Sequence, residues 1–170
     1  MTYIEILDTT IKIGLGAFIT GLLAYFNQKT NHKAVISKDR LEYNRKLLTT
    51  ISADIEDVSH LILKIWSIFE FEAKKESIDK EQLFTRLKPL RNKLFDDFKL
   101  LSKSEGSLLL HGYNDQQEKL RFFGELLGEF NTYTLFKNDS VKVTTTSQYR
   151  KKILEARKDL YRSLNTAMSE

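Results

Sequence analysis

The chain has 170 residues, of which 41% are hydrophobic and 29% charged, and its formal net charge is +4. This length is enough for one ordinary domain, and the absence of cysteine excludes a disulfide scaffold and a thiolate metal site. So small a net charge does not by itself indicate nucleic-acid binding. Seven glycines and one proline predict long helices with few turns.

An apolar run near the N-terminus, Ile13–Phe26 (IGLGAFITGLLAYF), holds no acidic or basic residue. Its fourteen residues are fewer than the roughly 20 that a bilayer core of about 30 Å requires. Read as Thr9–Gln28 the segment reaches that length, with the Lys12 ammonium extending toward the headgroups. We therefore expect a retained transmembrane helix within residues 1–30. A buried core helix and a cleaved signal peptide are the alternatives.

The charges that flank this run predict its orientation. Only Lys12 precedes it, opposed by Glu5 and Asp8, whereas basic residues gather directly after it. Positive flanks stay in the cytoplasm, so we expect a single-pass protein of the bacterial inner membrane with its N-terminus outside and its C-terminal domain cytoplasmic. The basic residues expected to contact anionic lipid next to the membrane are Lys29, Lys33, Lys38 and Arg40.

Small residues recur along the same segment at steps of three, four and three, which keeps them on one helix face. Helices in lipid associate through small residues, because these permit close backbone approach. The pattern predicts a self-association face, and the segment is also the candidate to line a pore. Its residues are Gly14, Ala17, Gly21 and Ala24, with Lys12 at the outer edge.

The remaining residues, 31–170, are expected to form a bundle of about four helices. A long helix over about residues 35–76 is predicted by apolar positions at alternating steps of three and four. Whether it continues unbroken from the membrane helix is left open by the sequence. The positions that define its inward face are Leu41, Asn44, Leu48, Ile51, Ile55, Val58, Ile62, Ile65 and Phe69.

Three further helices are expected. Asp79 with Gln82 forms a capping pair that starts the second helix, in which Pro89 predicts a kink or restart. A connector is expected between Gly106 and Gly112.

Asn114 with Gln117 is a second capping signal, for a helix reaching about Phe136, and its aromatic residues are expected in the core. A mobile loop is then predicted over Lys137–Thr146 and a last helix over Ser147–Met168. The inward positions of that last helix are Ile153, Ala156, Leu160, Leu164 and Ala167.

Catalytic and metal motifs are missing, so no enzyme activity, cofactor or metal is expected. Two polar features could contact RNA or an acidic partner. One is Arg91 with Asn92, just after Pro89. The other is the basic C-terminal helix, with Arg150, Arg157 and Arg162. The alternative for the second feature is an ordinary solvated helix face.

The layout of an N-terminal spanning helix with small-residue spacing and an all-helical domain of this size resembles one family. It is the small membrane accessory protein of type VI-B CRISPR systems, the partner of an RNA-guided RNA nuclease. The resemblance implies a divergent HEPN-type helical domain, oligomerisation into a pore, and membrane depolarisation once viral RNA is sensed. It also implies the nuclease complex or RNA as a partner.

This chain departs from the HEPN nuclease motif, an arginine followed after four to six residues by histidine. Arg91 is followed instead by Asp96 and Asp97 at that spacing, so no general acid or base for RNA cleavage is evident. The apolar segment, its small-residue face and the missing catalytic groups favour a homo-oligomeric, pore-forming membrane protein, and the resemblance implies a role in antiviral defence. The alternatives are a membrane-tethered interaction module, such as a scaffold or a phage-encoded inhibitor, and a divergent ribonuclease.

Overall fold

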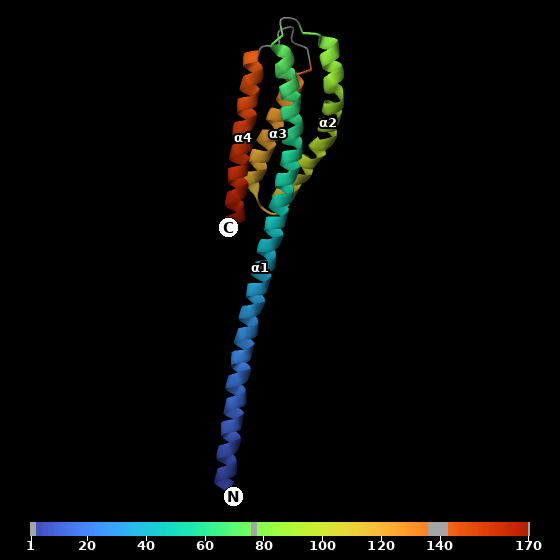
Figure 1. Cartoon of the computed structure of the whole chain (residues 1–170). Helices are drawn as coiled ribbons and strands as arrows, with labels where there is room; N and C mark the ends of the chain where they lie inside the picture. Colours follow the sequence, from blue (N-terminus) through green and yellow to red (C-terminus); the bar gives the residue numbers. More distant parts are fainter. Residues whose placement is uncertain (1–2, 76–77, 136–142, 170) are drawn as a thin grey trace. The chain divides into compact units, whose positions relative to one another are not determined.

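The computed structural model describes residues 3–75, 78–135 and 143–169, without the side chains of residues 3–19, 30, 32–34 and 169. These ranges contain no strand, which confirms the predicted all-α class. They form four helices (Figure 1): α1 (Tyr3–Ala73), α2 (Lys80–Leu110), α3 (Asn114–Tyr133) and α4 (Val143–Ser169). The long helix is thus part of a single α1, which settles its continuity with the N-terminal segment.

The chain divides into two compact units, Met1–Arg45 and Lys46–Glu170. In the second unit, successive helices run in opposite directions and pack as the predicted four-helix bundle (Figure 1). Side-chain hydrogen bonds join each helix to its two neighbours around the bundle. Examples are Glu72–Arg86 between α1 and α2, Gln117–Glu105 between α2 and α3, Gln116–Ser163 between α3 and α4, and Trp66–Thr146 between α1 and α4.

The core lies along the centre of this bundle and follows the predicted helical periods. In α1 the predicted seam is buried from Leu48 to Phe69, whereas Leu41 is 39% exposed and Asn44 half-buried. All five inward positions predicted for the last helix are buried. The aromatic residues of α3 do not all lie in the core: Phe123 and Phe130 are fully buried, whereas Phe122 is 55% exposed. The expectation that Phe122 belongs to the core is therefore wrong.

Helix α2 begins as predicted and continues further than predicted. Asp79 is its N-cap and accepts a hydrogen bond at 3.0 Å from the backbone N–H of Gln82. The helix passes through Pro89 without a restart. Proline removes the N–H that would bond the carbonyl of Thr85. Both residues are exposed, so water can reach that carbonyl.

The predicted connector between Gly106 and Gly112 is mostly helix, since α2 ends only at Leu110. The turn that follows is a Schellman motif. The N–H of Tyr113 donates to the carbonyl of Leu108 at 2.9 Å, and that of Gly112 to the carbonyl of Leu109 at 3.1 Å. Gly112 has φ 78°, a left-handed conformation that suits glycine because it has no Cβ.

Two further expectations at helix ends are corrected. The N-cap of α3 is Tyr113, which makes no side-chain capping bond, so Asn114 does not cap it and Gln117 bonds Glu105 of α2 instead. Val143–Thr146 belong to the first turn of α4 rather than to a loop, and the Thr146 carbonyl accepts the Trp66 indole N–H of α1 at 3.1 Å. The remainder of the predicted loop, up to residue 142, lies outside the described residues.

Candidate functional site

Arg91 and Asn92, predicted together as a contact for RNA or an acidic partner, point in different directions. Asn92 is exposed, whereas Arg91 is only 9% exposed and lies between α2 and α3. Its Nη2 donates hydrogen bonds to the carbonyl and to the hydroxyl of Thr134, the latter at 2.8 Å. Thr134 is the C-cap of α3, where the carbonyl groups lack helical partners and carry partial negative charge.

The guanidinium of Arg91 thus serves as a cap for the end of α3. The Thr134 hydroxyl also donates to the carbonyl of Asn131 at 2.8 Å, which completes the capped turn. Burial lowers the pKa of Arg91 below its usual value. An arginine stays protonated at neutral pH even so, and the positive charge remains available to the helix end.

A second cluster joins α1 to α4. Arg157 donates from Nη2 to both carboxylate oxygens of Glu56, and the distance to Oε2 is 2.6 Å. The Tyr161 hydroxyl lies 2.7 Å from Glu56 Oε1 and 3.0 Å from the Ser52 carbonyl, so its one proton is shared between two acceptors. The Arg157 guanidinium also lies over the Tyr161 ring, at 5.7 Å from the centroid.

The charges of this cluster stabilise one another. Hydrogen bonds from Arg157 and then from Tyr161 lower the pKa of Glu56, and the bond to Glu56 raises the pKa of Arg157. Burial, and then the neighbouring Glu56, raise the pKa of Tyr161, which keeps its hydroxyl protonated. At neutral pH the cluster is therefore a carboxylate held by a guanidinium and a phenol, without an acid or base poised to titrate.

This cluster borders a shallow depression of about 340 Å³, lined by Glu56, Leu154, Arg157, Lys158 and Tyr161. Arg150 lies further along the same side of α4, with its guanidinium 4.5 Å from the centroid of the Trp66 ring. Arg162 lies elsewhere, 67% exposed in its side chain, and pairs with Asp159 at 3.3 Å. The three predicted arginines thus do not form one surface, and each contacts a neighbour in its own chain.

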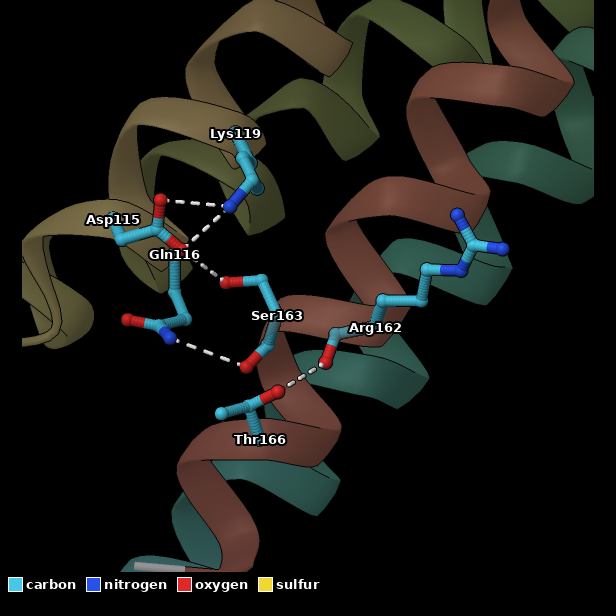
Figure 2. A network of polar contacts seen from close by, with 6 residues as sticks. All are labelled: Asp115, Gln116, Lys119, Arg162, Ser163 and Thr166. Atoms are coloured by element: carbon cyan, nitrogen blue, oxygen red, sulfur yellow. Dashed lines mark hydrogen bonds and ion pairs between the residues drawn. The ribbon is translucent and has the colours of Figure 1, made fainter.

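A polar network between α3 and α4 carries no residue that the sequence singled out except Arg162 (Figure 2). Asp115 accepts hydrogen bonds from Lys119, at 2.6 and 2.7 Å, and from the hydroxyl of Ser163 at 2.6 Å. Gln116 donates to the Ser163 carbonyl at 3.1 Å. In Figure 2 the Arg162 guanidinium points away from these groups, and only its carbonyl takes part, as acceptor for Thr166.

The hydrogen bonds from Lys119 and then Ser163 lower the pKa of Asp115. Asp115 lies in the first turn of α3, where a negative charge is favourable. An acidic residue at the start of a predicted helix is a signal that the sequence alone provides for Asp115. The Ser163 partner lies 48 residues away and could not be found from spacing. The network holds the start of α3 against α4.

The N-terminal part of α1 holds the other predicted residues. Four of them lie outside the described side chains: Lys12, Gly14, Ala17 and Lys33. The others are exposed: Gly21, Ala24, Lys29, Lys38 and Arg40. Large apolar side chains are exposed there too, with Leu22 at 40%, Leu23 at 60%, Tyr25 at 61% and Phe26 at 56%. A Cβ added at Gly21 would meet no atom within 4 Å.

In the part of the chain that the structure describes, no helix has both the length and the apolar character required to cross a membrane. Nor do three or more histidine or carboxylate side chains come together there as a metal site would need. No known protein family, curated protein or solved structure matches this chain.

Proposed function

We propose that this chain is a single-pass protein of the bacterial inner membrane that self-associates through the N-terminal segment, with the bundle in the cytoplasm. The observation that carries the proposal is the exposure of Leu22, Leu23, Tyr25 and Phe26, which continue the apolar run begun at Ile13. Apolar surface of this extent is unfavourable in water, and lipid or another apolar helix would cover it.

Gly21 supports self-association in particular. Glycine inside a helix costs about 1 kcal/mol relative to alanine. No atom of the described chain would meet a Cβ at this position, so packing within the chain does not account for the glycine. Close approach of a second helix in lipid does account for it. The exposed Lys29, Lys38 and Arg40 support a cytoplasmic position for the residues that follow.

The proposal extends to a pore that depolarises the membrane in antiviral defence of the CRISPR type. This step rests on the resemblance in layout to the type VI-B accessory proteins, with an RNA-guided nuclease complex or RNA as the signal. Within the bundle, Arg91 caps the end of α3 and Arg157 pairs with the Glu56 carboxylate, so both arginines have structural roles. In the proposed role the bundle acts through binding and assembly, not through catalysis.

Dye leakage from liposomes that contain the purified chain tests the pore. Gly21→Leu adds bulk on the small-residue face and is expected to reduce leakage by about tenfold or more. Leu23→Phe adds bulk about 200° away around the helix and is the matched control, expected to leave leakage unchanged. Equal leakage from the wild type and Gly21→Leu would count against the small-residue face, and no leakage at all would remove the pore.

A membrane-tethered interaction module is the second candidate. It is favoured by exposed aromatic side chains on the bundle itself, such as Phe95 and Phe122. This alternative predicts a monomer or a dimer in mild detergent and no dye leakage. A larger defined ring would exclude it, so particle mass in detergent separates the two candidates.

A further inference from the structure

The outer surfaces of α2 and α3, which are neighbours in the bundle, carry opposite charge. α2 contains seven basic and four acidic residues, whereas α3 contains two basic and four acidic ones. Lys99 and Lys103 are exposed on α2, and Glu125 and Glu129 are exposed on α3. None of these four makes an ion pair with another described residue.

Each of these pairs places like charges one turn apart on its own helix. Spacings of four residues bring Lys99 close to Lys103 and Glu125 close to Glu129, and such like-charge pairs destabilise a helix by themselves. An approaching surface of the opposite sign would relieve both. The α2 surface suits an acidic partner and the α3 surface a basic one.

Apolar side chains are interspersed among these charges. Phe95 is 79% exposed on α2, and Phe122 is 55% exposed on α3. Leu110, at the end of α2, is 83% exposed. Aromatic residues are enriched at protein interfaces relative to the rest of the surface, and charged residues surround them at the rim.

Glycines on the same surface have no packing role within the chain. A Cβ added at Gly106 of α2 or at Gly128 of α3 would meet no atom within 4 Å. Gly124, which faces α2, would by contrast place a Cβ 3.8 Å from Leu101. Because glycine costs a helix stability, Gly106 and Gly128 call for an explanation outside the chain, and close approach of another helix supplies one.

The register between α2 and α3 shows which partner fits. Within the chain, Arg91 lies beside Thr134, Leu101 near Gly124, and Glu105 beside Arg121, so the two helices run antiparallel in constant register. In this register Lys99 lies at the same height along the bundle axis as the stretch between Glu125 and Glu129. Lys103 lies at the height of Phe122. A two-fold axis parallel to the helices would place α2 of one copy against α3 of a second copy. Rotation about this axis keeps each residue at the same height, so the same residues would face each other between the two copies.

We propose that the outer face of α2 and α3 is a self-complementary dimer interface, in which Lys99 and Lys103 of one copy contact Glu125 and Glu129 of a second copy. The interface lies in the bundle and is separate from the small-residue face of the N-terminal segment. It deepens the proposed self-association and rests on it for the identity of the partner, a second copy of this chain.

Charge reversal in the full-length chain tests the interface by particle mass in mild detergent. Variant A is Lys99→Glu with Lys103→Glu, and variant B is Glu125→Lys with Glu129→Lys. Each alone places like charges across both halves of the two-fold interface and is expected to weaken dimerisation by about tenfold or more. All variants carry Gly21→Leu, so that contacts through the N-terminal segment do not contribute.

An equimolar mixture of variants A and B is expected to recover the dimer. Glutamates on α2 of A then face lysines on α3 of B, and the reciprocal contact has the wild-type charges. A chain carrying all four reversals should recover it as well. The control on another surface, Lys151→Glu with Lys158→Glu on α4, is expected to leave the mass unchanged, and the helical circular-dichroism signal should be the same for every variant.

The Gly21→Leu chain separates this inference from the proposed function. A monomer of that chain with wild-type charges would overturn the bundle interface and leave the N-terminal face as the site of association. A dimer that persists in variants A and B would also overturn it. Monomers that bind vesicles of anionic lipid, and lose this binding in variant A, would assign the α2 surface to lipid and overturn the dimer.

Discussion

Arg91 of α2 holds Thr134 at the C-terminal end of α3, through hydrogen bonds from its Nη2 to the Thr134 carbonyl and hydroxyl. The two residues are 43 positions apart in the chain. The contact places a buried positive charge at the negative end of a helix dipole. It gives Arg91 a role within the fold, and it leaves Asn92 as the exposed member of the pair.

Replacement of Arg91 by alanine is expected to lower the free energy of unfolding by about 2–3 kcal/mol, because charged hydrogen bonds to a buried partner are lost. The matched change Asn92→Ala, at an exposed neighbour on the same helix, should stay within about 0.5 kcal/mol of the wild type. Urea denaturation followed by circular dichroism measures both. An Arg91→Ala chain of unchanged stability would show that the helix cap contributes nothing.

Glu56 should make stability depend on acid pH. Arg157 and Tyr161 lower its pKa in the folded state below the ordinary value of 4.5, so its contribution is fully present above that value. It is lost as pH falls through the lower folded pKa. Glu56→Gln should therefore be less stable than the wild type at pH 7, and the difference should shrink toward pH 3. The effect should be within about 1 kcal/mol, since the carboxylate is half-exposed.

Thermal unfolding at pH 7, 5 and 3 measures this difference between Glu56→Gln and the wild type. Asp57→Asn, the neighbouring exposed carboxylate, is the control and should show little dependence. A constant difference at all three pH values would mean that the ionised form of Glu56 is not the stabilising species.

Two glycines near the end of α2 should respond to alanine in opposite directions. Gly112 has φ 78°, and alanine there should destabilise the chain by about 1 kcal/mol. Gly106 lies inside the helix with open space around its Cα, so alanine should stabilise the monomer by about 0.5–1 kcal/mol. Differential scanning calorimetry reports both signs in one experiment, and a shift of the same sign in the two variants would contradict the turn geometry.

Adjacent phenylalanines on α3 provide a test of the core. Phe123→Ala removes a fully buried ring and should cost about 3–5 kcal/mol. Phe122→Ala removes a ring that is 55% exposed and should leave the stability of the monomer within about 0.5 kcal/mol. Denaturant unfolding compares them. Equal losses would place both rings in the core, against the observed exposure.

Local patterns in the sequence determined the helices and most of the core. The apolar period of α1 from Leu48 onward and that of α4 identify buried positions correctly, because a helix presents every third or fourth residue to the same side. Asp79 was identifiable as an N-cap because the cap and its donor, the backbone N–H of Gln82, lie within one helical turn. The continuation of α2 past Gly106 could not be predicted in this way, because a single glycine does not interrupt a helix whose inner face is packed.

Tertiary structure alone decided the roles of the polar residues. The helix period places Arg91 on the side of Leu87 and Leu94 and Asn92 on another side, but only the tertiary structure shows that Arg91 meets Thr134 of α3. The sequence pairs Gln117 with Asn114 as a capping signal, but in the structure Gln117 bonds Glu105 of α2. Arg157 looks like a solvated basic residue in the sequence, but its guanidinium lies 2.6 Å from the Glu56 carboxylate. A helix period gives the direction of a side chain about its own axis. The partner it meets there depends on how helices far apart in sequence pack together.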